Sequence, residues 1–221
     1  MYVKKEVRYY MFRGEQYPSE TVQHKVFHVL LTFAFGMVLG FIAKYSDAIQ
    51  TNGILENMWD IISALTTRLG FWVLLATILA VWSKNPRMAA TKVFVFFVGI
   101  LLIYYIYSMW IFGFFPSYYF MRWGLIALAS PLAAYIVWYS KGAGWTAALC
   151  AALPIGLLVS EGYPFFYTFS IALGIELLFA IILFFMLQVN KKQGLRMLLW
   201  IVLVVIIIRN SNALTYIFGG L

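Results

Sequence analysis

Long apolar segments recur along the whole chain and constrain its fold more than any other feature. A helix needs about 20 mostly apolar residues to cross a bilayer, and seven segments approach that length. They lie at about residues 26–43, 69–83, 93–113, 119–139, 145–160, 165–188 and 197–218. Because only helices and closed barrels satisfy their backbone hydrogen bonds in lipid, the pattern predicts an all-α integral membrane protein with a seven-helix bundle.

The amino-acid composition excludes a water-soluble globule. Of the 221 residues, 64% are hydrophobic and 11% are charged, whereas about a quarter of the residues in a soluble domain are charged. No polar segment is long enough for a second domain, so residues 1–221 are predicted to form one membrane domain. Residues 1–25 are polar and basic, and we expect them to form a cytoplasmic N-terminal segment.

The distribution of basic residues predicts the orientation of the bundle. With the N-terminus inside and the C-terminus outside, twelve of the 16 basic residues fall on the cytoplasmic side, as the positive-inside rule requires. They are Lys4, Lys5, Arg8, Arg13, Lys25, Lys84, Arg87, Lys92, Lys141, Lys191, Lys192 and Arg196. Membrane orientation thus explains the net charge of +8, and nucleic acid is not an expected partner.

Two segments leave the number of spans open. Residues 54–66 carry apolar side chains at helical spacing on one face and polar ones on the other, which favours an amphipathic helix lying in the membrane interface. The alternative is one long tilted helix that continues straight into segment 69–83. The last segment must carry Arg209 and Asn210 beyond its apolar run to Ile208 in order to span. If it does not span, the count drops to six.

Small residues at four-residue spacing predict close helix packing. Thr32, Gly36 and Gly40 form one such stripe, and Gly144, Ala148, Ala152 and Gly156 form another. Stripes of this kind let two helix backbones approach closely. We expect them to pack within the chain, with a homo-oligomer as the alternative.

Glu176 is the most informative polar residue, because it lies near the middle of segment 165–188. A charged side chain at the centre of a bilayer costs about 2.5–3.5 kcal/mol on insertion scales. Glu176 is therefore expected to face the bundle interior, either as a helix-locking group or as part of a substrate or proton site. Counting from the helix ends puts Arg209 within about 5 Å of its depth, so Arg209 is the predicted partner, with Asn210 and Asn212 adding hydrogen bonds.

Two prolines lie near the middles of neighbouring segments. Ser130-Pro131 and Pro154 occupy segments 119–139 and 145–160. A proline frees a backbone carbonyl, and facing broken helices form substrate sites in secondary transporters. The predicted binding residues are therefore Glu176, Arg209, Ser130, Pro131, Pro154, Asn210 and Asn212. Ordinary kinking is the alternative for the prolines.

No motif predicts an enzyme, a cofactor or a metal. The chain contains no HExxH, GxSxG, P-loop or CxxC pattern. His24 and His28 are the only histidines, and their spacing on one helix supplies two ligands without a third. No catalytic residue is assigned, and no cofactor or metal is expected.

Short aromatic-rich motifs over about residues 55–165 resemble those of a group of small uncharacterised bacterial multi-spanning membrane proteins of unknown function. They are Trp59, Gly70-Phe71-Trp72, Ser83-Lys84-Asn85-Pro86, Tyr104-Tyr105, Ser130-Pro131 and Gly144-Trp145. The resemblance implies a multi-pass protein of the bacterial plasma membrane and transfers no catalytic residue.

These observations favour a protein that binds or transports a small molecule at a polar site near the middle of the membrane. The second hypothesis is a non-transporting accessory subunit of a membrane complex, and the third is a membrane-embedded enzyme. The expected partners are the lipid bilayer and a small-molecule ligand, and a second copy or a partner subunit is the alternative.

Overall fold

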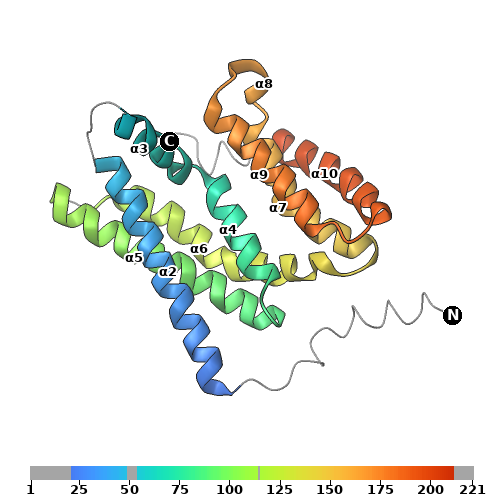
Figure 1. Ribbon diagram of the computed structural model, residues 1–221, viewed down its shortest axis with the longest axis horizontal. Coiled ribbons are helices and arrows are strands. Elements are labelled where there is room, and N and C mark those ends of the chain that lie inside the picture. Colours follow the sequence, from blue (N-terminus) through green and yellow to red (C-terminus); the bar gives the residue numbers. More distant parts are fainter. Residues whose placement is uncertain (1–20, 49–53, 114, 212–221) are drawn as a thin grey trace. The chain divides into compact units, whose positions relative to one another are not determined.

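The computed structural model describes residues 21–48, 54–113 and 115–211, and within these ranges every regular element is a helix (Figure 1). Its elements in chain order are α2 (Val22–Ala48), α3 (Ile54–Thr67), α4 (Leu69–Val81), α5 (Pro86–Phe112), α6 (Ser117–Trp138), the short 3-10 helix η1 (Tyr139–Lys141), α7 (Gly144–Gly162), α8 (Phe165–Thr168), α9 (Ile171–Leu187) and α10 (Lys191–Ser211). The prediction of an all-α protein is confirmed for this part of the chain.

Five of the described helical segments are long and apolar enough to cross a membrane. They are Val22–Ser46, Pro86–Ile111, Ser117–Lys141, Gly144–Thr168 and Lys191–Ser211. A bent pair formed by α3 and α4 raises the count to six if it is taken as one span, and α9 is a shorter apolar helix. The chain is therefore a multi-pass membrane protein, while the count of seven and the orientation stay predictions.

A sharp bend separates α3 from α4. Trp59–Thr67 and Leu69–Val81 meet at an angle of 73° across Arg68. The alternative of one straight helix is thus wrong, because the amphipathic α3 and the wholly apolar α4 need different surroundings. The helix predicted at residues 54–66 is present, and the bend suits an interfacial position.

The predicted segment 165–188 is two helices rather than one. The short α8 ends at Phe169, whose backbone is left-handed with φ 51°, and α9 begins at Ile171. The run of aromatic residues here made the apolar segment look continuous, since apolar character alone does not reveal a local turn. The helical part that carries Glu176 is accordingly only 17 residues long.

The described chain divides into two compact units. Unit 1 comprises residues 70–89 and 134–211, and unit 2 comprises residues 21–69 and 90–133, apart from the undescribed positions. Both α5 and α6 contribute residues to each unit.

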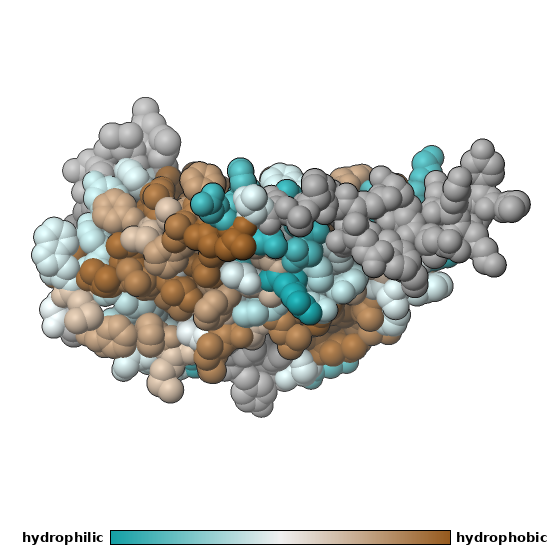
Figure 2. Space-filling model, turned by 90° about the horizontal axis from the view of Figure 1, so that it is seen from below, coloured by the Kyte–Doolittle hydropathy of each residue, from teal (hydrophilic) through white to brown (hydrophobic). Residues whose placement is uncertain are grey.

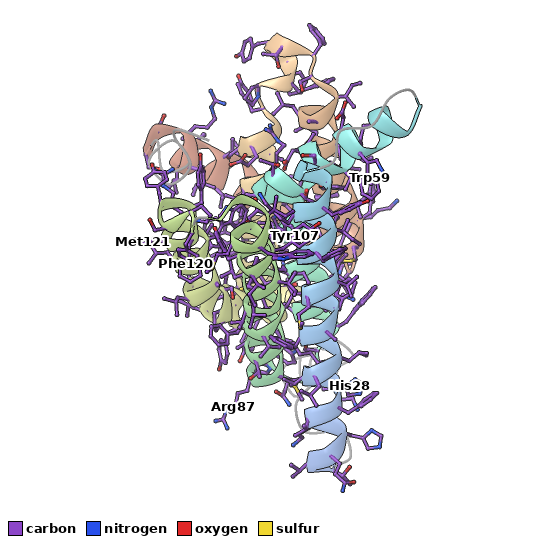
Figure 3. The ribbon with its side chains drawn as sticks, turned by 90° about the vertical axis from the view of Figure 1, so that its left-hand side faces the viewer. His28, Trp59, Arg87, Tyr107, Phe120 and Met121 are labelled. Atoms are coloured by element: carbon purple, nitrogen blue, oxygen red, sulfur yellow. The ribbon has the colours of Figure 1, made fainter. Side chains whose placement is uncertain are left out.

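Unit 2 is built on the close approach of α2 and α5. A Cβ atom added to Gly40 would lie 2.6 Å from the carbonyl oxygen of Ile100, and one added to Gly99 would lie 2.5 Å from that of Phe33. The Thr32, Gly36 and Gly40 stripe therefore packs within the chain, as predicted. Figure 3 shows the two helices side by side, with Tyr107 near the end of α2 opposite to His28. At that end the ring centroids of Tyr107 and Phe41 are 5.2 Å apart.

Unit 1 has α7 at its centre, in contact with both α9 and α10 (Figure 1). The small residues Ala148 and Ala152 of the predicted second stripe are fully buried, and Gly156 meets Val204 of α10. Gly144 does not share this packing role. It begins α7 with φ 94°, a conformation that glycine adopts readily, and nothing lies within 4 Å of where its Cβ would be.

Large apolar side chains cover much of the outer surface. Leu128, Leu132 and Phe185 are each about two-thirds exposed although they lie within long helices. Brown apolar residues form broad areas of the face drawn in Figure 2. Apolar surface of this extent on spanning helices suits contact with lipid tails rather than with water.

Candidate binding site around Glu176

Glu176 lies in the buried face of α9. The buried residues of this helix are Leu173, Glu176, Ala180, Leu183 and Leu187, which recur every three to four residues. Glu176 is only 1% exposed. An acidic side chain thus occupies a core position that its neighbours fill with apolar groups, as the sequence predicted.

Gly70 of α4 provides the space for this side chain. A Cβ atom added to Gly70 would overlap the carboxylate oxygen Oε2 of Glu176. One turn further along α9, the rings of Phe71 and Phe179 lie with their centroids 6.4 Å apart. The two helices therefore pack directly, and the missing side chain of Gly70 leaves room for the carboxylate.

The position of Gly70 matters for electrostatics as well as for space. It is the second residue of α4, directly after the bend at Arg68. The first turn of a helix has backbone N–H groups without helical partners and carries the positive end of the helix dipole. A carboxylate in contact with this turn is stabilised by it, which lowers the cost of burying Glu176.

The predicted pairing of Glu176 with Arg209 is wrong. The guanidinium carbon of Arg209 lies 3.8 Å from the ring centroid of Tyr163, and Arg209 is exposed whereas Glu176 is buried. The hydroxyl of Tyr163 lies 2.9 Å from that of Tyr167 in a hydrogen bond. Arg209 thus belongs to an exposed tyrosine cluster rather than to the buried carboxylate.

The depth calculation failed because the helices begin at other residues than predicted. From the α9–α10 connection, Glu176 lies eleven residues back along α9, or about 17 Å, whereas Arg209 lies eighteen residues along α10, or about 27 Å. The two side chains therefore differ in depth by about 10 Å, whereas the predicted helix boundaries gave a difference of about 5 Å. An arginine stacked on an aromatic ring near the end of a helix also keeps its charge close to water.

The hydroxyl of Ser130 compensates for the backbone hydrogen bond that Pro131 removes from α6. Pro131 removes the hydrogen bond to the carbonyl of Ala127, and the hydroxyl of Ser130 donates to that same oxygen at 2.8 Å. Ser130 is 6% exposed. This hydrogen bond supports ordinary kinking, the alternative for Pro131, while a binding role for Ser130 and Pro131 stays a prediction.

The other predicted site residues are spread over different places. Pro154 is buried inside α7, and Asn210 is exposed in the last turn of α10. Asn212 lies outside the described residues. Ser130 and Pro131 belong to unit 2, whereas Glu176, Pro154, Arg209 and Asn210 belong to unit 1. Their convergence on one site stays a prediction.

Sequence reasoning missed Gly70 as a site residue. The signal was available in retrospect, because Gly70 follows a charged residue between an amphipathic helix and an apolar one. A glycine at such a junction favours a helix break. Which side chain fills the space above that glycine depends on packing between helices about a hundred residues apart in the chain.

Comparison with known proteins adds a family but no activity. The model of a family of unknown function, DUF6518, matches residues 19–218. No curated protein and no solved structure matches the chain.

Proposed function

This chain belongs to DUF6518, a family of unknown function, and on that premise we propose that it binds or transports a small molecule at a polar site around Glu176. The observation that carries the proposal is the carboxylate of Glu176, 1% exposed and seated against Gly70 in the first turn of α4. Intramembrane carboxylates are costly, and in membrane proteins they commonly mark substrate or ion pathways.

The broken helix beside Glu176 supports a binding role. Helix ends within a span expose backbone groups, and such breaks occur where they line a cavity or are buried in protein. Transporters use the ends of discontinuous helices to form their substrate sites. In this chain the break at Arg68, the glycine at position 70 and the buried carboxylate follow the same pattern.

The chemistry of a carboxylate indicates the class of ligand. Its two oxygens offer about four acceptor sites, so it can accept hydrogen bonds from a ligand and from the protein together. A molecule that carries an ammonium group or another strong hydrogen-bond donor is the expected ligand. If the molecule is transported, alone or together with a proton, the carboxylate of Glu176 is the group that binds it.

The test compares two glutamates of unit 1. Glu176→Gln removes the buried negative charge, while Glu161→Gln makes the same change in the last turn of α7. Thermal unfolding of the purified protein is followed with choline, putrescine, lysine and arginine as probes. We expect at least one probe to raise the unfolding midpoint of the wild type and of Glu161→Gln, and to leave Glu176→Gln unshifted.

Gly70→Ala provides a second variant that keeps the charge. Its added methyl group would displace the carboxylate, so we expect the probe-induced shift to be lost here too. If no probe shifts the wild type, or if the shift survives in Glu176→Gln, the binding proposal is wrong. A loss of stability in both variants without any probe effect would instead favour the helix-locking role expected of an accessory subunit.

A further inference from the structure

Helices α7 and α10 of unit 1 run parallel, and they begin at the same level. Near their starts, the guanidinium carbon of Arg196 lies 5.4 Å from the ring centroid of Trp145. Eleven residues further along α7, a Cβ atom added to Gly156 would lie 2.6 Å from Val204 Cγ1. Since contacts advance in the same direction along both helices, their N-termini at Gly144 and Lys191 lie side by side.

This end of unit 1 is strongly basic. We call it the basic end and define it by Lys84, Lys141, Lys191, Lys192 and Arg196. Lys84 belongs to it because the indole N–H of Trp138 donates to the carbonyl of Ser83 at 2.8 Å.

The acidic residues in the described part of unit 1 lie away from the basic end. The two acidic residues there are Glu161, in the last turn of α7, and Glu176, about 17 Å from the end of α9. The positive-inside rule accounts for a surplus of basic residues at one end of a bundle. The rule does not account for buried polar side chains without hydrogen-bond partners at the same end.

Two polar side chains at the basic end are buried and have no hydrogen-bond partner for one polar atom each. They are Ser140 Oγ and Gln193 Nε2, in residues that are 0% and 2% exposed. Buried polar atoms nearly always have partners, so each such exception asks for an explanation. Both atoms can donate a hydrogen bond.

The side chain of Gln193 lies on the face of α10 that packs against α7. Gln193, Met197, Ile201 and Val204 form the buried stripe of α10, and the contact of Val204 with Gly156 shows that this stripe faces α7. Gln193 lies in the first turn, and helical side chains tilt toward the N-terminus of their helix. Ser140 lies in η1, immediately before α7.

The start of α7 has free donors as well. Its capping residue is Ala143, which forms no side-chain cap, so the first backbone N–H groups of α7 have no side-chain acceptor. Adjacent helix N-termini each carry about half a positive charge and present N–H groups to an anion. At the start of α10, Oδ1 of Asn190 accepts the backbone N–H of Gln193 at 2.8 Å, so the N–H groups without a side-chain acceptor are those at the start of α7.

We propose that the basic end of unit 1 binds the phosphate group of an anionic ligand between the N-termini of α7 and α10. Arg196 and the lysines supply the charge, and Gln193 and Ser140 supply neutral donors from below. The exposed indole of Trp145, 53% accessible, suits the interface between lipid and water. The phosphate comes either from a lipid headgroup or from a soluble compound, and this site is separate from the one around Glu176.

The experiment measures the rise in thermal unfolding midpoint of the detergent-solubilised full chain as ligand is added. One arm uses phosphatidylglycerol, a second uses inorganic phosphate, and zwitterionic phosphatidylcholine is the lipid control. Dissociation constants follow from the concentration dependence of the shift. A response to phosphatidylglycerol alone assigns the site to a lipid headgroup, and a response to inorganic phosphate assigns it to soluble phosphate compounds.

Two arginines of α10 form a matched pair of variants. Arg196→Gln removes a guanidinium stacked on Trp145 at the basic end, and Arg209→Gln removes one stacked on Tyr163 in the last turn. We expect Arg196→Gln to weaken binding by about tenfold or more, as for a lost hydrogen bond to a charged group. Arg209→Gln should bind as the wild type does.

Ser140→Ala and Gln193→Leu test the neutral donors, and each should weaken binding by a few-fold without a change of charge. The proposal is overturned if neither ligand shifts the wild type more than phosphatidylcholine does. It is also overturned if Arg209→Gln weakens binding as much as Arg196→Gln, because general attraction between charges would then suffice. Wild-type affinity in both Arg196→Gln and Ser140→Ala would show that the unpartnered atoms bind only water.

Discussion

In unit 2 the glycines of α2 and α5 lie against backbone atoms of the facing helix, whereas in unit 1 Gly70 and Gly156 lie against side chains. Gly40 meets the carbonyl of Ile100, while Gly156 meets the side chain of Val204 and Gly70 meets the carboxylate of Glu176. The same residue type therefore brings two backbones together in one unit and makes room for a particular side chain in the other. The contacts in unit 2 are rigid, and those in unit 1 depend on the identity of the neighbour.

The largest effect is expected in unit 2. Gly40→Ala would press a methyl group against the backbone of Ile100, and neither helix can yield without moving apart. We expect a loss of about 3 kcal/mol in the free energy of unfolding, at the upper end for an overpacked core. Thermal unfolding in detergent measures it.

Gly124→Ala is the control for that prediction. Gly124 also lies in a helix of unit 2, but nothing is within 4 Å of where its Cβ would be. Alanine should leave stability unchanged or raise it by up to about 1 kcal/mol, because alanine favours helix formation. Equal stability of Gly40→Ala and Gly124→Ala would show that α2 and α5 do not approach as closely as described.

A smaller and reversible effect is expected at Gly156. Gly156→Ala should cost about 2 kcal/mol, because its methyl group meets Val204. Val204→Ala removes Cγ1, the nearest atom at 2.6 Å, and leaves the Cβ atom at 2.9 Å. The clash is thereby reduced, so Gly156→Ala combined with Val204→Ala should be more stable than the sum of the two single losses predicts. The measured quantity is the coupling energy of the double-mutant cycle, expected at about 1–2 kcal/mol.

If the losses of stability of Gly156→Ala and Val204→Ala are additive, Gly156 does not depend on the side chain of its neighbour, and the distinction between side-chain contacts in unit 1 and backbone contacts in unit 2 is wrong. The corresponding variant in unit 2 cannot be rescued in this way, because Gly40 faces the backbone of Ile100 rather than its side chain.

The smallest effect is expected at Gly174. Its Cβ would lie 3.2 Å from an edge atom of the Phe165 ring, which can shift by a few tenths of an ångström. The gain in helix propensity of about 1 kcal/mol then offsets the contact, so Gly174→Ala should stay within about 0.5 kcal/mol of the wild type in thermal unfolding. A loss as large as that of Gly40→Ala would mean that Phe165 is held rigidly by α8.

Much of the helix pattern was predictable from local sequence. The helices at 54–66, 69–83 and 119–139 were predicted within three residues of their observed ends. Their boundaries follow from changes between apolar and polar composition, which short windows of sequence reveal. The break at Phe169 was not predictable in this way, because the aromatic residues on both sides of it are equally apolar.

The candidate site was predictable only in part. The burial of Glu176 follows from the cost of a carboxylate in lipid, which acts on one residue at a time. Its neighbour Gly70 and the stacking of Arg209 on Tyr163 depend on how helices align, and an error of a few residues in a helix boundary moves a side chain by several ångströms.

By itself the sequence determined that this chain is helical, that it crosses a membrane several times, and that Glu176 faces inward. These properties follow from the hydrophobicity of each segment and from the need of its backbone N–H and C=O groups for hydrogen bonds in lipid, which a helix satisfies within itself. Only the tertiary structure decided that Glu176 rests against Gly70 and that α7 and α10 run parallel with their N-termini side by side. Such contacts join distant segments, and packing geometry rather than local composition selects them.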